Sequence, residues 1–353
     1  MKNLHIKAKL YDYDVEFTDD FSKQISAYSE KTAFVIDQNV FKLYKEKILI
    51  PKERVFLMDA VEDKKNMDTV MDIIRYLKEL GVRKDWTVVC VGGGITQDVT
   101  TVAADLFLRN VDWHLFPTTL LSMCDSCIGG KCGINLDSYK NQIGVFYPPK
   151  RIVIDTAFID TLTPGDYLNG WGEILKFALT NGEEFFDKIV SEKSFIPCER
   201  IEEYIYDGLR VKQAVIEEDE YESDIRRILN YGHTFGHALE AYTHHVIPHG
   251  KGVIWGIDVV NYIGYKKGLI SELYYLEIKD LIRRAFLLEE IVIDDARKLY
   301  EIIKTDKKVK NGSLSFAMLD ARSHLIVYPI ELNDELFNLF VEYLVTTHEY
   351  YSH

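Results

Sequence analysis

The sequence lacks the features of membrane, secreted and low-complexity proteins. No apolar run approaches the roughly 18 residues of a membrane helix, and the segment before Phe17 has no apolar core of a signal peptide. Proline is scarce, with 8 residues in 353. No Pro-rich, Gly/Ser-rich or Gln/Asn-rich stretch and no internal repeat occurs. We therefore expect a globular protein located in the cytoplasm.

Basic residues are also fewer than acidic residues. The chain has 42 Lys and Arg against 56 Asp and Glu, a formal net charge of −14. Nucleic acids and anionic membranes would be repelled, so we expect neither as a partner. The length suggests one large domain or two of ordinary size, and the 47% apolar and 28% charged residues are typical of globular proteins.

The number of cysteines, five, is odd, and without a secretion signal this indicates reduced thiols. Cys124, Cys127 and Cys132 cluster, and such spacing can bind a metal or carry out redox chemistry. Cys90 and Cys198 are isolated and supply no second pair. We favour a tight loop of small residues in which cysteine replaces serine or alanine.

Strand-like and helix-like segments alternate in the first part of the chain. Apolar strand candidates lie at 33–36, 87–91, 112–116 and 152–154, and residues 67–80 have helical spacing. After about residue 160 the pattern is helical, with candidates at 168–180, 199–217, 229–243, 252–267 and 273–286 and a hairpin at 313–319 and 324–329. This predicts an α/β nucleotide-binding domain at 1–160 and a mostly α-helical domain at 161–353.

A glycine run follows the strand candidate 87–91. Gly92, Gly93 and Gly94 precede a helical segment that contains Asp98. Glycine lets the backbone approach a diphosphate, and a helix N-terminus supplies amide donors. Asp37 follows the strand candidate 33–36 and could accept hydrogen bonds from ribose hydroxyls, or could cap a helix.

Histidines gather late in the chain, with five of the ten between residues 233 and 249. His233 and His237 are spaced to face one side of a helix, and either could bind a metal on spacing alone. His249 supplies a third imidazole. Glu173, surrounded by apolar residues, fits a further ligand of Zn²⁺, although with Lys176 it could also form a surface ion pair.

Cations occur at positions that we expect to face a ligand. Each alone could be a solvated charge, but together they suggest a phosphorylated, anionic substrate. They are Lys131, Lys140 (next to Asn141), Arg109 and the pair Lys307 and Lys308.

From about residue 33 to 310 the chain resembles the sugar phosphate cyclase family, and within it most closely the 3-dehydroquinate synthases. The motifs that carry the resemblance are Gly92–Asp98, Pro117–Ser122, Asp125–Lys131, Lys140-Asn141, Gly172–Lys176, Lys212, Arg226, Asn230–His237 and His249-Gly250.

The resemblance implies a homodimeric lyase of the shikimate pathway, which makes the precursors of aromatic amino acids. Such an enzyme converts 3-deoxy-arabino-heptulosonate 7-phosphate into 3-dehydroquinate and phosphate through transient oxidation by NAD⁺. The implied fold is dehydroquinate synthase-like: a nucleotide-binding α/β domain followed by a helical metal-binding domain.

The resemblance also implies the site residues. Glu173, His233 and His249 would hold Zn²⁺ or Co²⁺. NAD⁺ would contact Asp37, Asn39, Glu62, Lys65, Gly93, Gly94, Asp98, Thr118, Thr119, Lys131 and Lys140. Catalytic groups would be Asp125, Lys131, Lys176, Lys212, Arg226, Asn230 and His237, and Arg109, Lys140, Asn141, Lys307 and Lys308 would bind substrate.

Departures from the family pattern leave alternatives open. Gln97 replaces a glycine and is expected to crowd the phosphate turn, and Lys251 and Asp224 also depart from the family. A divergent cyclase making amino-dehydroquinate, 2-deoxy-scyllo-inosose or a valiolone is therefore the main alternative. A metal-dependent polyol dehydrogenase and a non-catalytic ligand-binding relative are further ones.

Overall fold

The structure is a computed structural model. It describes the chain except residues 1, 138, 181–182, 193–194, 196–197, 245, 286–290, 306–308, 310–311 and 352–353, and it leaves the side chains of 348–351 undescribed. The predicted substrate residues Lys307 and Lys308 lie outside the described residues. None of the helices in the described part of the chain is both long enough and apolar enough to cross a membrane.

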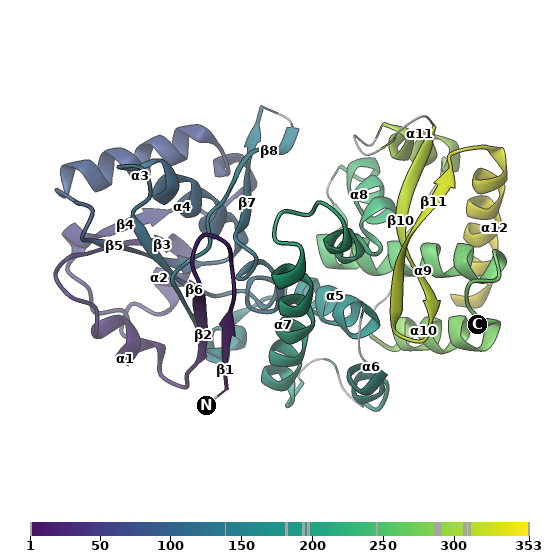
Figure 1. Ribbon diagram of the computed structural model, residues 1–353, viewed down its shortest axis with the longest axis horizontal. Helices are drawn as coiled ribbons and strands as arrows, with labels where there is room; N and C mark the ends of the chain where they lie inside the picture. Colours follow the sequence, from purple (N-terminus) through teal and green to yellow (C-terminus); the bar gives the residue numbers. More distant parts are fainter. Residues whose placement is uncertain are drawn as a thin grey trace. The chain divides into compact units, whose positions relative to one another are not determined.

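The described chain forms two compact units (Figure 1). The first comprises Met1–Gly170 and Ile201–Tyr221, and the second comprises Trp171–Arg200 and Glu222–His353. The division falls within helix α5 (Pro164–Thr180). The domain boundary after residue 160 stays a prediction, and the compact units differ from it mainly because residues 201–221 belong to the first.

The first unit is built on a seven-stranded sheet in the order β1-β2-β9-β6-β5-β3-β4. Its strands are β1 (Asn3–Ile6), β2 (Tyr13–Phe17), β3 (Thr32–Asp37), β4 (Val55–Met58), β5 (Thr87–Gly92), β6 (Asp112–Pro117) and β9 (Arg151–Ile154). All neighbours pair in parallel except β1 and β2. Central strands are buried apolar runs, as expected of a parallel sheet covered on both faces.

Helices and short turns connect these strands. The connecting ones are α1 (Phe21–Ser26), α2 (Gln38–Leu43), α3 (Met67–Glu79) and α4 (Gly94–Leu106), with the short segments η1 (Lys52–Arg54), η2 (Glu62–Lys64) and η3 (Ser122–Ser126). The segment η4 (Thr156–Thr161) and helix α7 (Ile201–Glu218) come after the last strand of the sheet. Helix α4 packs against α3 and against β3, β5 and β6. Because parallel strands end at one edge, the glycine turn after β5 and the residues after β6 are neighbours, and Gly92 pairs with Pro117.

The predicted strands at 33–36, 87–91, 112–116 and 152–154 correspond to β3, β5, β6 and β9. Strand β4 was not predicted, and neither were two hairpins. One is the hairpin β1–β2. The other is the hairpin formed by β7 (Lys131–Leu136) and β8 (Tyr139–Phe146), of which β8 is largely exposed and lacks the apolar pattern of a buried strand.

The second unit is helical around an antiparallel hairpin. The helices are the end of α5, α6 (Glu183–Val190), α8 (His233–Tyr242), α9 (His249–Lys266), α10 (Glu272–Ala285), α11 (Ala296–Lys304) and α12 (Asp334–Tyr351), and η5 (Ile225–Asn230) precedes α8. The hairpin is β10 (Ser313–Ala321) with β11 (His324–Glu331). The predicted α/β and helical parts are confirmed.

Helix α9 is the centre of this unit, in contact with α8, α10, α12 and β10 (Figure 1). Its backbone approaches α8 so closely that a Cβ on Gly256 would lie 2.0 Å from the carbonyl oxygen of Gly232. Gly232 itself has a φ of +75°, which glycine adopts without strain. Glycine at these positions therefore sets the spacing between α8 and α9.

We expect Gly256→Ala to destabilise the protein by about 1–3 kcal/mol, because the added methyl group forces α8 and α9 apart. Gly264→Ala on the same helix is the matched control, since its Cβ would meet Met318 Cε at 3.5 Å, an ordinary contact. There the better helix propensity of alanine should leave stability unchanged or raise it by up to about 1 kcal/mol. Urea denaturation followed by circular dichroism measures both, and equal midpoints would contradict the close-packing interpretation.

Candidate functional site

The glycine turn in the first unit forms a helix N-terminus that a ligand can approach. Gly93 is the N-cap residue of α4, and no described side chain caps that end. A Cβ on Gly93 would lie 2.7 Å from Thr119 Cγ2, whereas one on Gly94 would meet no described atom within 4 Å. Uncapped amides at the start of a 13-residue helix, beside open space, fit a diphosphate.

Asp37 ends β3 and caps α2. Its Oδ1 accepts hydrogen bonds from the main-chain nitrogens of Asn39 at 2.8 Å and Val40 at 3.4 Å. Burial raises the pKa of this carboxyl, although both hydrogen bonds act against that effect. The helix cap is thus observed, while contact between Asp37 or Asn39 and a ribose stays a prediction.

A polar network joins several of the predicted cofactor residues. Lys65 Nζ lies 2.7 Å from Asp98 Oδ2 and donates to Asn141 Oδ1 at 2.8 Å. Asn135 Oδ1 accepts from the main-chain nitrogen of Asn141 at 3.0 Å, and Asn135 Nδ2 donates to Glu62 Oε1 at 2.8 Å. Asn135 was missed from sequence, because nothing in its neighbourhood indicates that the hairpin folds back onto η2.

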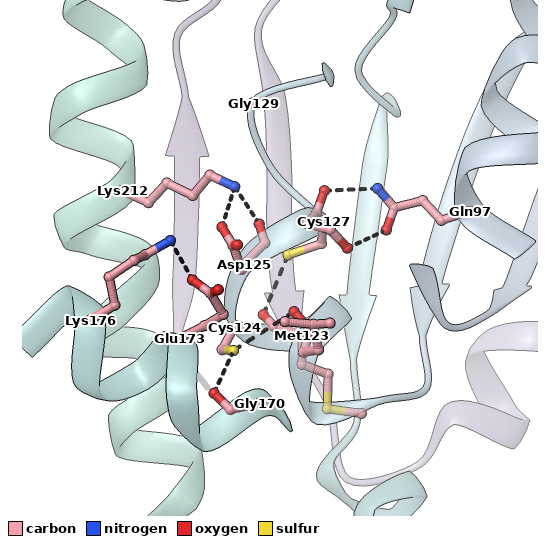
Figure 2. Close-up of polar contacts among 12 residues, drawn as sticks. Gln97, Met123, Cys124, Asp125, Cys127, Gly129, Gly170, Glu173, Lys176 and Lys212 are labelled. Carbon is pink, nitrogen blue, oxygen red and sulfur yellow. Dashed lines mark hydrogen bonds and ion pairs between the residues drawn. The ribbon is translucent and has the colours of Figure 1, made fainter. Parts of the chain in front are cut away.

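Lys212 and Asp125, both predicted to be catalytic, form a pair (Figure 2). Lys212 Nζ donates to Asp125 Oδ1 at 2.6 Å and to the Asp125 carbonyl oxygen at 2.7 Å. Lys212 comes from α7 and is buried, and Asp125 lies in η3. Packing of α7 against η3 within the first unit brings the two together.

The other predicted residues of this unit are less constrained. Thr118 is buried and donates its main-chain N–H to Gly92. Lys131 and Lys140 are exposed on the β7–β8 hairpin, with Lys140 Nζ 3.7 Å from Glu62 Oε1. Arg109 is exposed, and its carbonyl accepts a hydrogen bond from Lys84.

Gln97 does not behave as expected. Its side chain is buried and hydrogen-bonds Ser126 through both ends of its amide. The amide is therefore engaged with η3, and the expectation that it crowds the phosphate turn finds no support in the hydrogen bonds of this region.

In the second unit, a buried carboxylate lies among imidazoles. Glu173 is fully buried, and its Oε1 lies 3.5 Å from His233 Nε2 and 3.3 Å from His249 Nε2. One nitrogen from each of His233, His237 and His249 lies within 4.8 Å of the others. Lys176, also buried, contacts Glu173 Oε2 (Figure 2), so the alternative of a surface ion pair is wrong.

Two of the imidazoles are oriented through their far nitrogen. His233 Nδ1 lies 3.0 Å from the carbonyl oxygen of Tyr231, and His249 Nδ1 lies 2.8 Å from Glu240 Oε1. Both Nε2 atoms are thereby directed at Glu173. Metal-binding histidines are commonly fixed in this way. Glu240 was missed, although its position seven residues after His233 on the same helix face was a usable signal.

The electrostatics suit a divalent cation. Burial lowers the pKa of His233 well below its usual value, which keeps the imidazole neutral. Burial alone would raise the pKa of Glu173, but Lys176 and the histidines hold it well below its usual range. Burial would lower the pKa of His249, but hydrogen bonds to Glu173 and Glu240 raise it to about 10. A bound cation would take the place of that proton.

Glu173, His233 and His249 together offer one carboxylate and two imidazoles, a donor set that Zn²⁺ accepts with a position left for substrate. His237 is exposed, and its ring centroid lies 5.7 Å from that of His249. Asn230 donates to Glu222 Oε1 at 2.8 Å, and Arg226 is buried in η5.

Comparison with known proteins gives matches over both units. Residues 55–169 match the N-terminal and residues 170–309 the C-terminal family profile of 3-dehydroquinate synthase. A 3-dehydroquinate synthase of Alkaliphilus metalliredigens is 33% identical over 305 residues, 83% of this chain and 84% of its own. One from Dictyoglomus turgidum is 35% identical over 77% of this chain and 78% of its own.

Solved structures share the fold. A 2-deoxy-scyllo-inosose synthase complexed with carbaglucose-6-phosphate, NAD⁺ and Co²⁺ has a TM-score of 0.84 at 22% identity, over 97% of this chain and 100% of that one. A 2-epi-5-epi-valiolone synthase of Streptomyces hygroscopicus with NAD⁺ and Zn²⁺ bound has a TM-score of 0.84 at 23% identity, over 97% and 98%.

We expect Glu240→Gln and Glu240→Ala to weaken Zn²⁺ binding, by up to about 10–100-fold for alanine, because His249 loses its orienting carboxylate. Competition with a chromophoric chelator measures the dissociation constant, and the absorption spectrum of the Co²⁺ form reports the coordination. Glu335→Ala is the control, since Glu335 makes only an exposed ion pair with Lys267 among its described contacts. Wild-type Zn²⁺ affinity in both Glu240 variants would refute this role.

Proposed function

The chain belongs to the 3-dehydroquinate synthase family, and we propose that it converts 3-deoxy-arabino-heptulosonate 7-phosphate into 3-dehydroquinate and phosphate. One observation carries the choice of substrate. Relatives named 3-dehydroquinate synthase are 33–35% identical to this chain over 77–83% of its length. The synthases of 2-deoxy-scyllo-inosose and 2-epi-5-epi-valiolone reach 22–23%, a level that supports the shared fold alone.

Two bound groups complete the proposal. NAD⁺ would accept and later return a hydride, and Zn²⁺ or Co²⁺ would polarise the alcohol that is oxidised. Glu173, His233 and His249 would hold the metal. The uncapped amides at Gly93 and Gly94 would hold the diphosphate of NAD⁺, with the network around Lys65 and Asp98 beside them.

The remaining residues act on the substrate. Lys131, Lys140, Asn141 and Arg109 of the first unit, and Arg226 and Asn230 of the second, would bind its carboxylate and phosphate through charge-assisted hydrogen bonds. Lys307 and Lys308 are also proposed to bind the substrate.

Proton transfer and electrostatic stabilisation are assigned to a smaller group of residues. His237 is exposed at the imidazole cluster and would transfer a proton during the reaction. Lys176 keeps Glu173 charged. The Asp125–Lys212 pair presents an ammonium and a carboxylate in fixed positions, which contributes electrostatic stabilisation that needs no reorganisation. The enzyme is thus proposed to be a phosphate-eliminating carbon–oxygen lyase that acts as a homodimer.

We expect the purified protein with NAD⁺ and Zn²⁺ to release one phosphate for each 3-dehydroquinate formed, with no net NADH. Phosphate is measured by a colorimetric assay, NADH by absorbance and the product by mass spectrometry. Removal of the metal with a chelator should abolish phosphate release, and Zn²⁺ or Co²⁺ should restore it.

Parallel reactions with glucose 6-phosphate and sedoheptulose 7-phosphate test the alternative cyclases, because a carbocyclic product should form from one sugar phosphate only. Cyclisation of either of these in place of the heptulosonate would overturn the proposed substrate. Net NADH formation from a simple polyol would instead indicate a dehydrogenase. Bound NAD⁺ and metal without any turnover would indicate a ligand-binding relative.

A further inference from the structure

The first turn of α4 makes a contact outside its own helix. Gln97 is 4% exposed, its Nε2 donates to the carbonyl oxygen of Ser126 at 2.7 Å, and its Oε1 accepts from Ser126 Oγ at 2.9 Å. Figure 2 shows this side chain extended toward the segment that contains Asp125 and Cys127. A side-chain amide that bonds one residue through both ends fixes the backbone and the side chain of that residue together.

Ser126 is the last residue of η3, directly after Asp125. Two successive carbonyl oxygens of this turn thus accept hydrogen bonds from side chains of different helices: that of Asp125 from Lys212 on α7, and that of Ser126 from Gln97 on α4. The turn is of the π type, which occurs mostly as short segments at functional sites. Asp125 is therefore held between two helices.

The other end of this connection is the glycine turn. The main-chain nitrogen of Gln97 donates to the carbonyl oxygen of Gly93 at 2.9 Å, within the first turn of α4. Gln97, which holds η3, therefore belongs to the same helical turn as the main-chain amides that are proposed to bind a diphosphate.

We propose that Gln97 is a positioning residue that couples the glycine turn to the Asp125–Lys212 pair. The inference rests on the proposed function, in which a dinucleotide binds at that turn and the pair acts on the substrate. Gln97 touches neither ligand itself. Its amide sets the backbone of η3, and η3 sets where the Asp125 carboxylate and the Lys212 ammonium lie.

Three variants separate the parts of the clamp. Gln97→Ala removes both hydrogen bonds, and Gln97→Glu keeps the shape but replaces the Nε2 donor by an oxygen that repels the Ser126 carbonyl. Ser126→Ala removes only the bond to Oε1. Gln24→Ala is the matched control, because this half-buried glutamine on α1 also uses its amide in one side-chain contact, with Arg151.

We expect kcat to fall about tenfold in Gln97→Ala and at least as much in Gln97→Glu, the size expected for one or two lost buried hydrogen bonds. Ser126→Ala should lose about threefold or less, and Gln24→Ala nothing. The dissociation constant of NAD⁺, measured by fluorescence titration, should stay within about threefold of wild type in all four. A merely structural role would lower thermal stability and leave kcat of the folded protein unchanged, and that result would overturn the proposal.

Hydrogen exchange provides a readout that needs neither ligand nor turnover. In the ligand-free protein, amides of residues 122–128 should exchange faster in both Gln97 variants than in wild type, and at the wild-type rate in Gln24→Ala. Unchanged exchange would overturn the clamp even if the wild-type enzyme releases phosphate. Faster exchange in a protein that does not release phosphate would uphold the clamp and refute the proposed function instead.

Discussion

The proposed metal site of the second unit depends on how closely three helix backbones approach one another. A Cβ on Gly172 would lie 2.6 Å from the carbonyl oxygen of Gly250, and one on Gly256 would lie 2.0 Å from that of Gly232. Each of these glycines lies beside a predicted ligand or on the helix that carries one. Any larger residue would separate α5, α8 and α9, and the 3.3–3.5 Å distances from Glu173 to the two imidazoles would be lost.

That packing buries the carboxylate of Glu173, whose charge must then be compensated. A fully buried carboxylate is unfavourable unless charges or hydrogen bonds compensate it. Glu173 has Lys176 on one oxygen and two imidazole nitrogens near the other. Lys176 lies against one oxygen, whereas the imidazole side could exchange a proton for a metal ion. The close packing therefore produces both the need for a compensating positive charge and a set of groups that could coordinate a cation.

Sequence patterns predicted the elements but not their long-range contacts. Helices α3 and α10 have apolar residues at helical spacing, α9 and strands β5 and β6 are largely apolar and buried, and motifs located the glycine turn and the histidines. Strand β8 of the β7–β8 hairpin has mostly exposed residues, so it has no such pattern. The roles of Asn135 and Glu240 depend on partners far along the chain or on the geometry of a loop. Gln97 was misinterpreted because its partner, Ser126, lies 29 residues away.

The net charge of −14 conceals how three of the lysines with proposed functional roles are held. Lys65 faces Asp98, Lys176 faces Glu173 and Lys212 faces Asp125. Each ammonium is fixed by a carboxylate of the chain itself, so little net positive charge accumulates to attract arbitrary anions. An anionic ligand must then be recognised by position and not by charge alone, because only a group in the right place can hydrogen-bond an ammonium already oriented by its partner. An acidic protein could in this way hold ammonium groups for the proposed sugar phosphate beside its own carboxylates.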